Sequence, residues 1–261
     1  MLTLYYSPGA CSLVPHIALA EAGAEYTALR IPIADGGHLT PEYLAINPHA
    51  RLPALETEQG VITENIAVLN FIADRFGTAG SVPRGDPHAA ARCNELLGWF
   101  SSSVHIAFAQ VWRGARFTDD QTLWPALEAG GRKVLARQFE EIDALCAGEW
   151  LVPTGYTAAD GYALTFLRWA RRIGFDIGRY PRWSALASPG RPLSGAGVGL
   201  SLLDGLLRLD VTDIALPDAS FDVVVCSHVF EHVRALGEKD LQFAIELAQS
   251  LEAQRLKRAC I

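Results

Sequence analysis

Three features are missing from the sequence, and each absence excludes a class of protein. No apolar run approaches the roughly 18–20 residues that cross a bilayer, so we expect no membrane span. No basic run precedes an apolar stretch at the N-terminus, so we expect no secretory signal. The net charge is −7 and no lysine precedes Lys133, whereas a nucleic-acid binder needs a basic stripe. We therefore expect no nucleic-acid partner.

The five cysteines also lack a pattern. They are odd in number, scattered, and never spaced as Cys-x-x-Cys, which argues against a disulfide framework and against a zinc finger. The positions are Cys11, Cys93, Cys146, Cys226 and Cys260. Unpaired cysteines suit a reducing compartment, so we expect a cytoplasmic protein with no metal site.

Residues 1–80 alternate strand and helix signals. The strands are expected at 2–6, 26–33, 52–56 and 61–62, and the helices at 13–22, 41–46 and 64–76. This order, βαβ followed by ββα, implies a small mixed sheet with helices packed on it. The first domain is therefore predicted to be an α/β domain.

Residues 86–187 read differently. Long helical patterns dominate, at 87–111, 123–147 and 158–173, and predict an all-α domain. Residues 188–204 are rich in glycine, proline and serine and are predicted to be a linker. Residues 205–261 form an atypical tail, with a strand expected at 221–226 and a helix from about 239 to 258.

Cys11 follows the first predicted strand and precedes the first predicted helix. Unpaired N–H groups and the positive end of the helix dipole favour an anion at such a position. A thiol there is expected to have its pKa lowered from about 8.5 toward neutrality. The local pattern is equally compatible with a small, buried, apolar cysteine.

Two later segments favour a ligand site. Pro53 stands between a turn and a strand, where a cis peptide bond would leave the Leu52 N–H and C=O free to pair with an extended peptide. Glu64 and Asn65 precede a helix whose first N–H groups suit a carboxylate, and Glu64 could hold an ammonium group. A peptide with an amino-acid end, an extended backbone and a thiol fits all three features, and glutathione is such a peptide.

Several motifs in this order resemble one family. They are Tyr-Ser-Pro-Gly-Ala-Cys-Ser at 6–12, Asn-Pro-x-x-x-Leu-Pro-Ala-Leu at 47–55, Thr-Glu-Asn-x-Ala-Val-Leu at 63–69 and the capping box Thr157-Ala-Ala-Asp160. Together they resemble the bacterial, beta-like glutathione S-transferases that carry an N-terminal cysteine, over about residues 1–187. The resemblance implies a thioredoxin-like domain followed by an all-helical domain, in a detoxifying homodimer.

The resemblance also implies roles for individual residues. Cys11, Ser12 and His105 would be catalytic. Glutathione would be bound by Tyr6, Arg51, Leu52, Pro53, Glu64 and Asn65. Glutathione would be a co-substrate, joined to or exchanged with a small hydrophobic electrophile, and no cofactor would be tightly bound. The alternative is a protein of the same fold that binds ligands without turnover.

One departure from the family concerns positive charge. Relatives often carry lysines between the second strand and the cis-proline loop, whereas Arg51 is the only arginine or lysine of that region here. This sequence is compatible with weaker glutathione binding. It is also compatible with His38 and His49 substituting weakly for the missing lysines.

The tail contains two further patterns. Residues 205–235 resemble a fragment of an S-adenosylmethionine-dependent methyltransferase, with Asp210 near the adenine end of that cofactor. Only 11 positions separate Gly199 from Asp210, too few for the helix and strand such a site needs, so a methyltransferase activity is the minor alternative. His228-Val-Phe-Glu231-His232 spells a zinc-peptidase pattern, but it follows a predicted buried strand and no further zinc ligand is evident. We expect no metal there.

Overall fold

A computed structural model of the protein describes residues 1–77 and 81–187, which all lie in one compact unit. Residues 78–80 lie outside the described part. The predictions made for the linker at 188–204 and for the tail at 205–261 also lie outside it, including the strand at 221–226, the helix at 239–258 and the two tail motifs.

The first domain contains a four-stranded mixed sheet in the order β2-β1-β3-β4. β1 (Leu2–Tyr6) runs parallel to β2 (Tyr26–Arg30) and antiparallel to β3 (Ala54–Thr57), which pairs with β4 (Gly60–Thr63). The predicted strand at 26–33 ends at Arg30, because Pro32 has no N–H to continue the ladder. The mixed sheet predicted from the sequence is confirmed.

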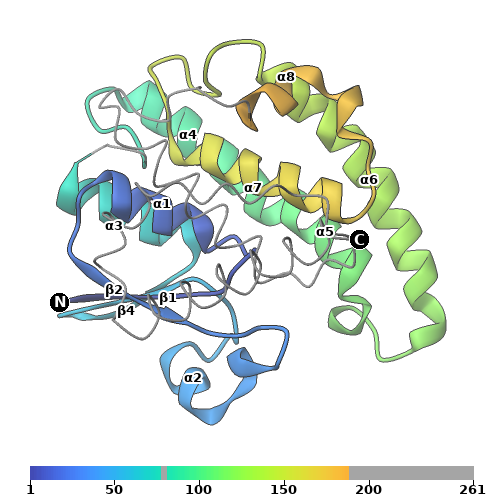
Figure 1. The fold of residues 1–261 in the computed structure, drawn as a ribbon, viewed down its shortest axis with the longest axis horizontal. Coiled ribbons are helices and arrows are strands. Elements are labelled where there is room, and N and C mark those ends of the chain that lie inside the picture. The colour runs from blue at the N-terminus through green and yellow to red at the C-terminus, as the bar shows by residue number, and fades with distance from the viewer. Residues whose placement is uncertain (78–80, 188–261) are drawn as a thin grey trace, which may run out of the picture. The chain divides into compact units, whose positions relative to one another are not determined.

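Three α-helices accompany this sheet. Figure 1 shows α1 (Leu13–Glu21) and α3 (Asn65–Phe76) on one face, and the short α2 (Pro41–Ile46) beyond the other. The helix α1 is apolar nearly all round and buries its residues from Leu13 to Leu19, because it also contacts α7 of the second domain. The sheet and α1 together fix the loop that carries Cys11.

The second domain is helical, as predicted. A long helical segment comprises α4 (Pro87–Trp99), a π-helical turn (Phe100–Val104) and α5 (His105–Trp112). It is followed by α6 (Trp124–Leu145), α7 (Ala158–Arg172) and the short α8 (Pro181–Ser184). Aromatic side chains from these helices form the core, with Phe100, Phe108, Phe139, Phe166 and Trp183 fully buried. The π-helical turn directly precedes His105, and such turns are frequent at functional sites.

The capping box expected at the start of α7 is present. Asp160 accepts hydrogen bonds from the backbone N–H of Thr157 and of Leu151, each at 2.9 Å. Burial raises the pKa of the Asp160 carboxyl above its ordinary value, while these hydrogen bonds act in the opposite direction. The box fixes where α7 begins and therefore where Tyr162, one half-turn later, enters the interior.

Candidate functional site

Cys11 lies in the loop between β1 and α1, and Ser12 closes this loop. The Ser12 hydroxyl accepts from the Ser7 N–H at 3.1 Å and donates to the Ser7 carbonyl at 3.2 Å. Ser12 is fully buried. The first helical N–H groups, those of Leu13 and Val14, bond to the carbonyls of Ala10 and Cys11. Ser12 therefore shapes the loop, and those two N–H groups already have backbone partners.

The structure contradicts the expected direction of the Cys11 pKa. The residue is only 7% exposed, and burial raises the pKa of the thiol to about 11. The charge of Arg113 and a hydrogen bond from Tyr162 lower the pKa, but desolvation outweighs them. Cys11 is therefore a neutral thiol in the unliganded chain, and its Sγ donates to the Leu52 carbonyl oxygen at 3.5 Å.

The Leu52–Pro53 peptide bond is cis, as predicted. The preceding carbonyl, that of Arg51, accepts from the Tyr43 hydroxyl and from the Asn47 side-chain amide, both at 2.7 Å, which fixes the loop. No hydrogen bond within the described part of the chain uses the Leu52 N–H. Of the two Leu52 backbone groups expected to pair with a docked peptide, the N–H is therefore available, whereas the carbonyl already accepts from the Cys11 thiol.

Glu64 and Asn65 lie at the start of α3. Glu64 has a φ of 69°, an uncommon conformation for a side-chain-bearing residue. The Asn65 amide nitrogen donates to the Cys11 carbonyl at 3.1 Å, and its buried Oδ1 has no hydrogen-bond partner among the described residues. Arg51 lies 3.9 Å from Glu64, but both side chains are more than half exposed, so this ion pair contributes little stability.

Tyr6 is placed differently from the other predicted site residues. Its ring packs on the His16 imidazole of α1, with centroids 5.0 Å apart. Tyr26 also packs against this imidazole, edge-on, with centroids 5.6 Å apart. Tyr6 thus contributes to the packing of α1 on the sheet.

His105 reaches the site through a tyrosine that sequence reasoning missed. Its Nδ1 lies 3.1 Å from the Tyr162 hydroxyl, and that hydroxyl lies beside the Cys11 sulfur. Burial, followed by the charges of Arg113, Arg116 and Arg51, lowers the pKa of His105 to about 3. The imidazole is therefore neutral. The only sequence signal for Tyr162 was its position two residues after the capping-box aspartate.

The helical domain is joined to the cysteine loop by Trp169. Its indole N–H donates to the Gly9 carbonyl at 2.7 Å, across 160 positions of sequence. The ring of Trp169 also packs edge-on against Trp112 at 5.1 Å. Trp112 is the last residue of α5, so this contact brings the end of that helix toward the loop of Cys11.

Two arginines after Trp112 were also missed. Arg113 directly follows α5, and its charge acts on Cys11 and on His38. Arg116 interacts electrostatically with Arg51 and with Glu64. The shortage of cations noted between the second strand and the cis-proline is therefore offset by two arginines from the other domain, which no local pattern could place there.

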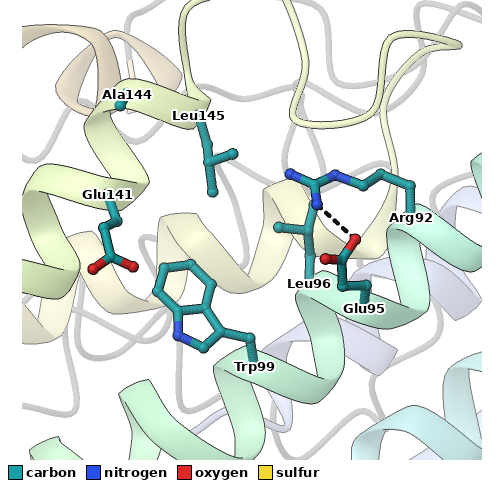
Figure 2. A pocket seen from close by; sticks show the side chains of 7 residues that line it. All are labelled: Arg92, Glu95, Leu96, Trp99, Glu141, Ala144 and Leu145. Atoms are coloured by element: carbon teal, nitrogen blue, oxygen red, sulfur yellow. Dashed lines mark hydrogen bonds and ion pairs between the residues drawn. The ribbon is translucent and has the colours of Figure 1, made fainter.

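A separate pocket of about 520 Å³ lies between α4 and α6. Figure 2 shows Trp99 and Leu96 inside it and the ion pair of Arg92 with Glu95, at 2.6 Å, on one rim. The other lining residues are Glu141, Ala144 and Leu145. None of these residues belongs to the cluster around Cys11.

The described residues show neither a metal centre nor a membrane-spanning helix. No group of three metal-ligating side chains occurs within 1–77 and 81–187. Of the helices in these ranges, not one combines the length and hydrophobicity that crossing a bilayer requires.

Two family models match the chain. One, described as the glutathione S-transferase N-terminal domain, matches residues 1–74. The other, described as a methyltransferase domain, matches residues 170–253 and includes the tail segment that resembles such an enzyme. Of this second match, residues 170–187 are described, and they pack in the helical domain, where the buried Trp183 indole donates to the Ala163 carbonyl at 2.9 Å.

Among curated proteins, glutathione S-transferase GST-4.5 of Xanthomonas campestris is 29% identical over 178 residues, covering 67% of this chain and 86% of that protein. Glutathione S-transferase GstA of Escherichia coli O157:H7 is 28% identical, with the same two coverages.

Solved structures agree. A glutathione transferase homologue from Sulfitobacter, crystallised with bound glutathione, is 32% identical with a TM-score of 0.67, covering 71% of this chain and 90% of its own. The beta-class glutathione S-transferase of Sphingomonas chungbukensis is 29% identical with a TM-score of 0.64, covering 80% and 98%. With the mixed sheet, the cis-proline and Cys11 at the first turn, these matches establish that the chain belongs to the glutathione S-transferase family.

Proposed function

We propose that this protein is a glutathione transferase in which the tripeptide lies along Leu52 with its sulfur beside Cys11. The observation that carries this proposal is the contact between the Cys11 thiol and the Leu52 carbonyl, next to the cis-proline. An extended peptide that pairs with the free Leu52 N–H would bring its own backbone N–H to the same carbonyl. The peptide would then compete with the Cys11 thiol for the Leu52 carbonyl. It would also bring its own cysteine beside Cys11.

The remaining charges fit the two ends of glutathione. The start of α3 supplies N–H groups for the γ-glutamyl carboxylate, and Glu64 with the unpartnered Asn65 Oδ1 supplies acceptors for its ammonium group. Arg51, Arg113 and Arg116 supply positive charge for the glycine carboxylate and for the thiolate. Positive charge favours the thiolate over the thiol and so activates the nucleophile.

We propose a small hydrophobic electrophile as the second substrate. The helical domain presents aromatic side chains next to the cysteine loop, chiefly Trp112 and Trp169. Such rings offer apolar contact area beside the reacting sulfur. The proposed role is detoxification of such electrophiles by conjugation or thiol exchange, which this arrangement supports.

We also propose a homodimer in the cytoplasm. The dimer rests on the resemblance to cytosolic transferases and on the groove between α4 and α6, where Trp99 offers apolar surface to a second copy. The proposal of a cytoplasmic location is supported by Cys11 and Cys93, because neither forms a disulfide and such thiols suit a reducing compartment.

The decisive experiment combines binding and turnover with the full chain. We expect retention on immobilised glutathione with elution by free glutathione, and conjugation of 1-chloro-2,4-dinitrobenzene followed by absorbance. Retention without turnover of this or a panel of other electrophiles would favour the ligand-binding alternative. Absence of both retention and turnover would overturn the proposal.

A second candidate function comes from the family match at residues 170–253. S-adenosylmethionine would be its cofactor. We expect calorimetric titration of the full chain with S-adenosylmethionine to show no heat of binding, because the described residues of the match belong to the transferase fold. Saturable binding would establish the methyltransferase alternative instead.

A further inference from the structure

The hydroxyl of Tyr162 lies at the centre of a buried polar cluster. The residue is 1% exposed, and its ring packs against Phe100 and Phe166. Its hydroxyl lies 3.1 Å from His105 Nδ1 and also interacts with the thiol of Cys11 and the side chain of Asn65. These groups come from both domains, so a single phenol connects the helical core to the sulfur.

The hydrogen bonds of this cluster form a chain in which each group donates to the next. The Cys11 thiol donates to the Leu52 carbonyl, so its sulfur is left to accept. The Tyr162 hydroxyl has one proton and forms a hydrogen bond with the Cys11 side chain, and because the sulfur is the available acceptor, the hydroxyl is the donor. Its oxygen must then accept from His105, which places the imidazole proton on Nδ1.

We propose that Tyr162 is a positioning residue of the transferase, one that holds a hydrogen-bond donor against the sulfur at the site and fixes the tautomer of His105. This inference rests on the proposed function. When a peptide N–H takes the Leu52 carbonyl, Cys11 loses its present acceptor. The Tyr162 hydroxyl then remains as the buried donor that can stabilise a negative sulfur, whichever thiol carries the charge.

Burial and the surrounding charges together make the sulfur the group that titrates. Burial raises the pKa of Cys11, Arg113 lowers it and Glu64 raises it, whereas burial and the charges of Arg113, Arg116 and Arg51 all lower the pKa of His105. His105, with its pKa at about 3, stays neutral from mildly acidic to alkaline pH. Burial raises the pKa of Tyr162 well above its ordinary value, so the phenol stays protonated. A change in thiol reactivity over this range therefore reports on the sulfur.

The test replaces Tyr162 by phenylalanine, which keeps the ring and removes only the hydroxyl. The rate at which iodoacetamide alkylates Cys11 is measured against pH, by mass spectrometry of the peptide that contains it. Below the pKa of the thiol we expect the rate in Tyr162→Phe to fall about tenfold, equivalent to a rise of one pKa unit. Tyr180→Phe is the matched control, because that ring packs on Phe139 and Trp183 away from the sulfur, and it should alkylate at the wild-type rate.

A second readout separates positioning from a merely structural role. Nitrogen-15 NMR of the His105 ring should show the proton on Nδ1 in the wild type and on Nε2 in Tyr162→Phe. A folded Tyr162→Phe protein with unchanged alkylation rate and unchanged tautomer would overturn the proposal. If this variant does not fold, His105→Leu serves instead, because it removes the donor to Tyr162 and should also slow alkylation. An unchanged alkylation rate in His105→Leu would contradict the proposal.

The alkylation assay contains no glutathione. If the wild-type protein bound no glutathione, the proposed function would fail while the effect of Tyr162 on Cys11 could still be observed. If glutathione bound and turned over but the alkylation rate did not change, only the role of Tyr162 would fail.

Discussion

Replacing Cys11 by alanine is expected to lower transferase turnover about 100-fold or more while leaving glutathione affinity within a few-fold of the wild type. The size follows from removing a group that contacts the reacting sulfur, since loss of one such group typically costs turnover by this factor. Affinity survives because the tripeptide is held by the Leu52 backbone, by the start of α3 and by the arginines. The measurement is steady-state kinetics with varied glutathione, together with calorimetric titration of glutathione into each variant.

Cys11→Ser is the matched variant that separates two roles for the sulfur. Serine keeps a hydrogen-bond donor beside Leu52 but does not form a mixed disulfide. If Cys11 acts by donating to the glutathione thiolate, as its pKa of about 11 favours, the serine variant should keep much of the conjugating activity. If Cys11 acts as a nucleophile in thiol exchange, serine and alanine should be equally inactive. Unchanged turnover and unchanged affinity in the alanine variant would contradict the placement of the site.

The parts of this site that depend on local sequence could be predicted. A cysteine between a strand and a helix, a proline in a turn before a strand and an acidic residue before a helix each carry a short-range signal. The cis bond at Pro53 and the order of strands and helices follow from such signals and are found as expected.

The electrostatics of the site could not be predicted in the same way. The pKa of Cys11 depends chiefly on burial and then on Arg113, Tyr162 and Glu64, which the fold brings to the sulfur from distant parts of the sequence. The pKa of Cys11 is raised and not lowered because desolvation by burial outweighs the favourable charges at the helix start. The role of Arg113 could not be predicted either, because tertiary contacts such as those of Phe108 and Trp112 with Trp169 bring α5 toward the cysteine loop.

The protein is expected to lose stability steeply between pH 6.5 and about pH 4, and His16 is a principal cause. His16 is only 8% exposed, packs against the rings of Tyr6 and Tyr26, and has its pKa lowered by burial to about 4. The unfolded chain binds a proton below about pH 6.5, whereas the folded chain does so only below about pH 4. Because the unfolded state binds more protons in this window, the free energy of unfolding falls with falling pH, by about 3 kcal/mol for His16.

His105 adds to this loss in the same direction, since its pKa is lowered to about 3. The contribution of His16 is isolated with His16→Phe, which keeps an aromatic ring against the two tyrosines but does not titrate. Urea unfolding at pH 7 and pH 4.5 should show a loss of stability smaller by about 2.5 kcal/mol in His16→Phe than in the wild type, whereas carboxylates contribute alike to both. His88→Gln, at an exposed position near the start of α4, is the matched control.

An equal loss of stability in the wild type and in His16→Phe would mean that His16 gains its proton without unfolding the chain. That result would contradict its burial against Tyr6 and Tyr26 and hence the close packing of α1 on the sheet. The same packing sets the position of the loop before α1, because Cys11 and His16 are separated by little more than one helical turn. Acid lability and the placement of the reactive sulfur therefore have one physical origin, the burial of the first turn of α1 between the sheet and α7.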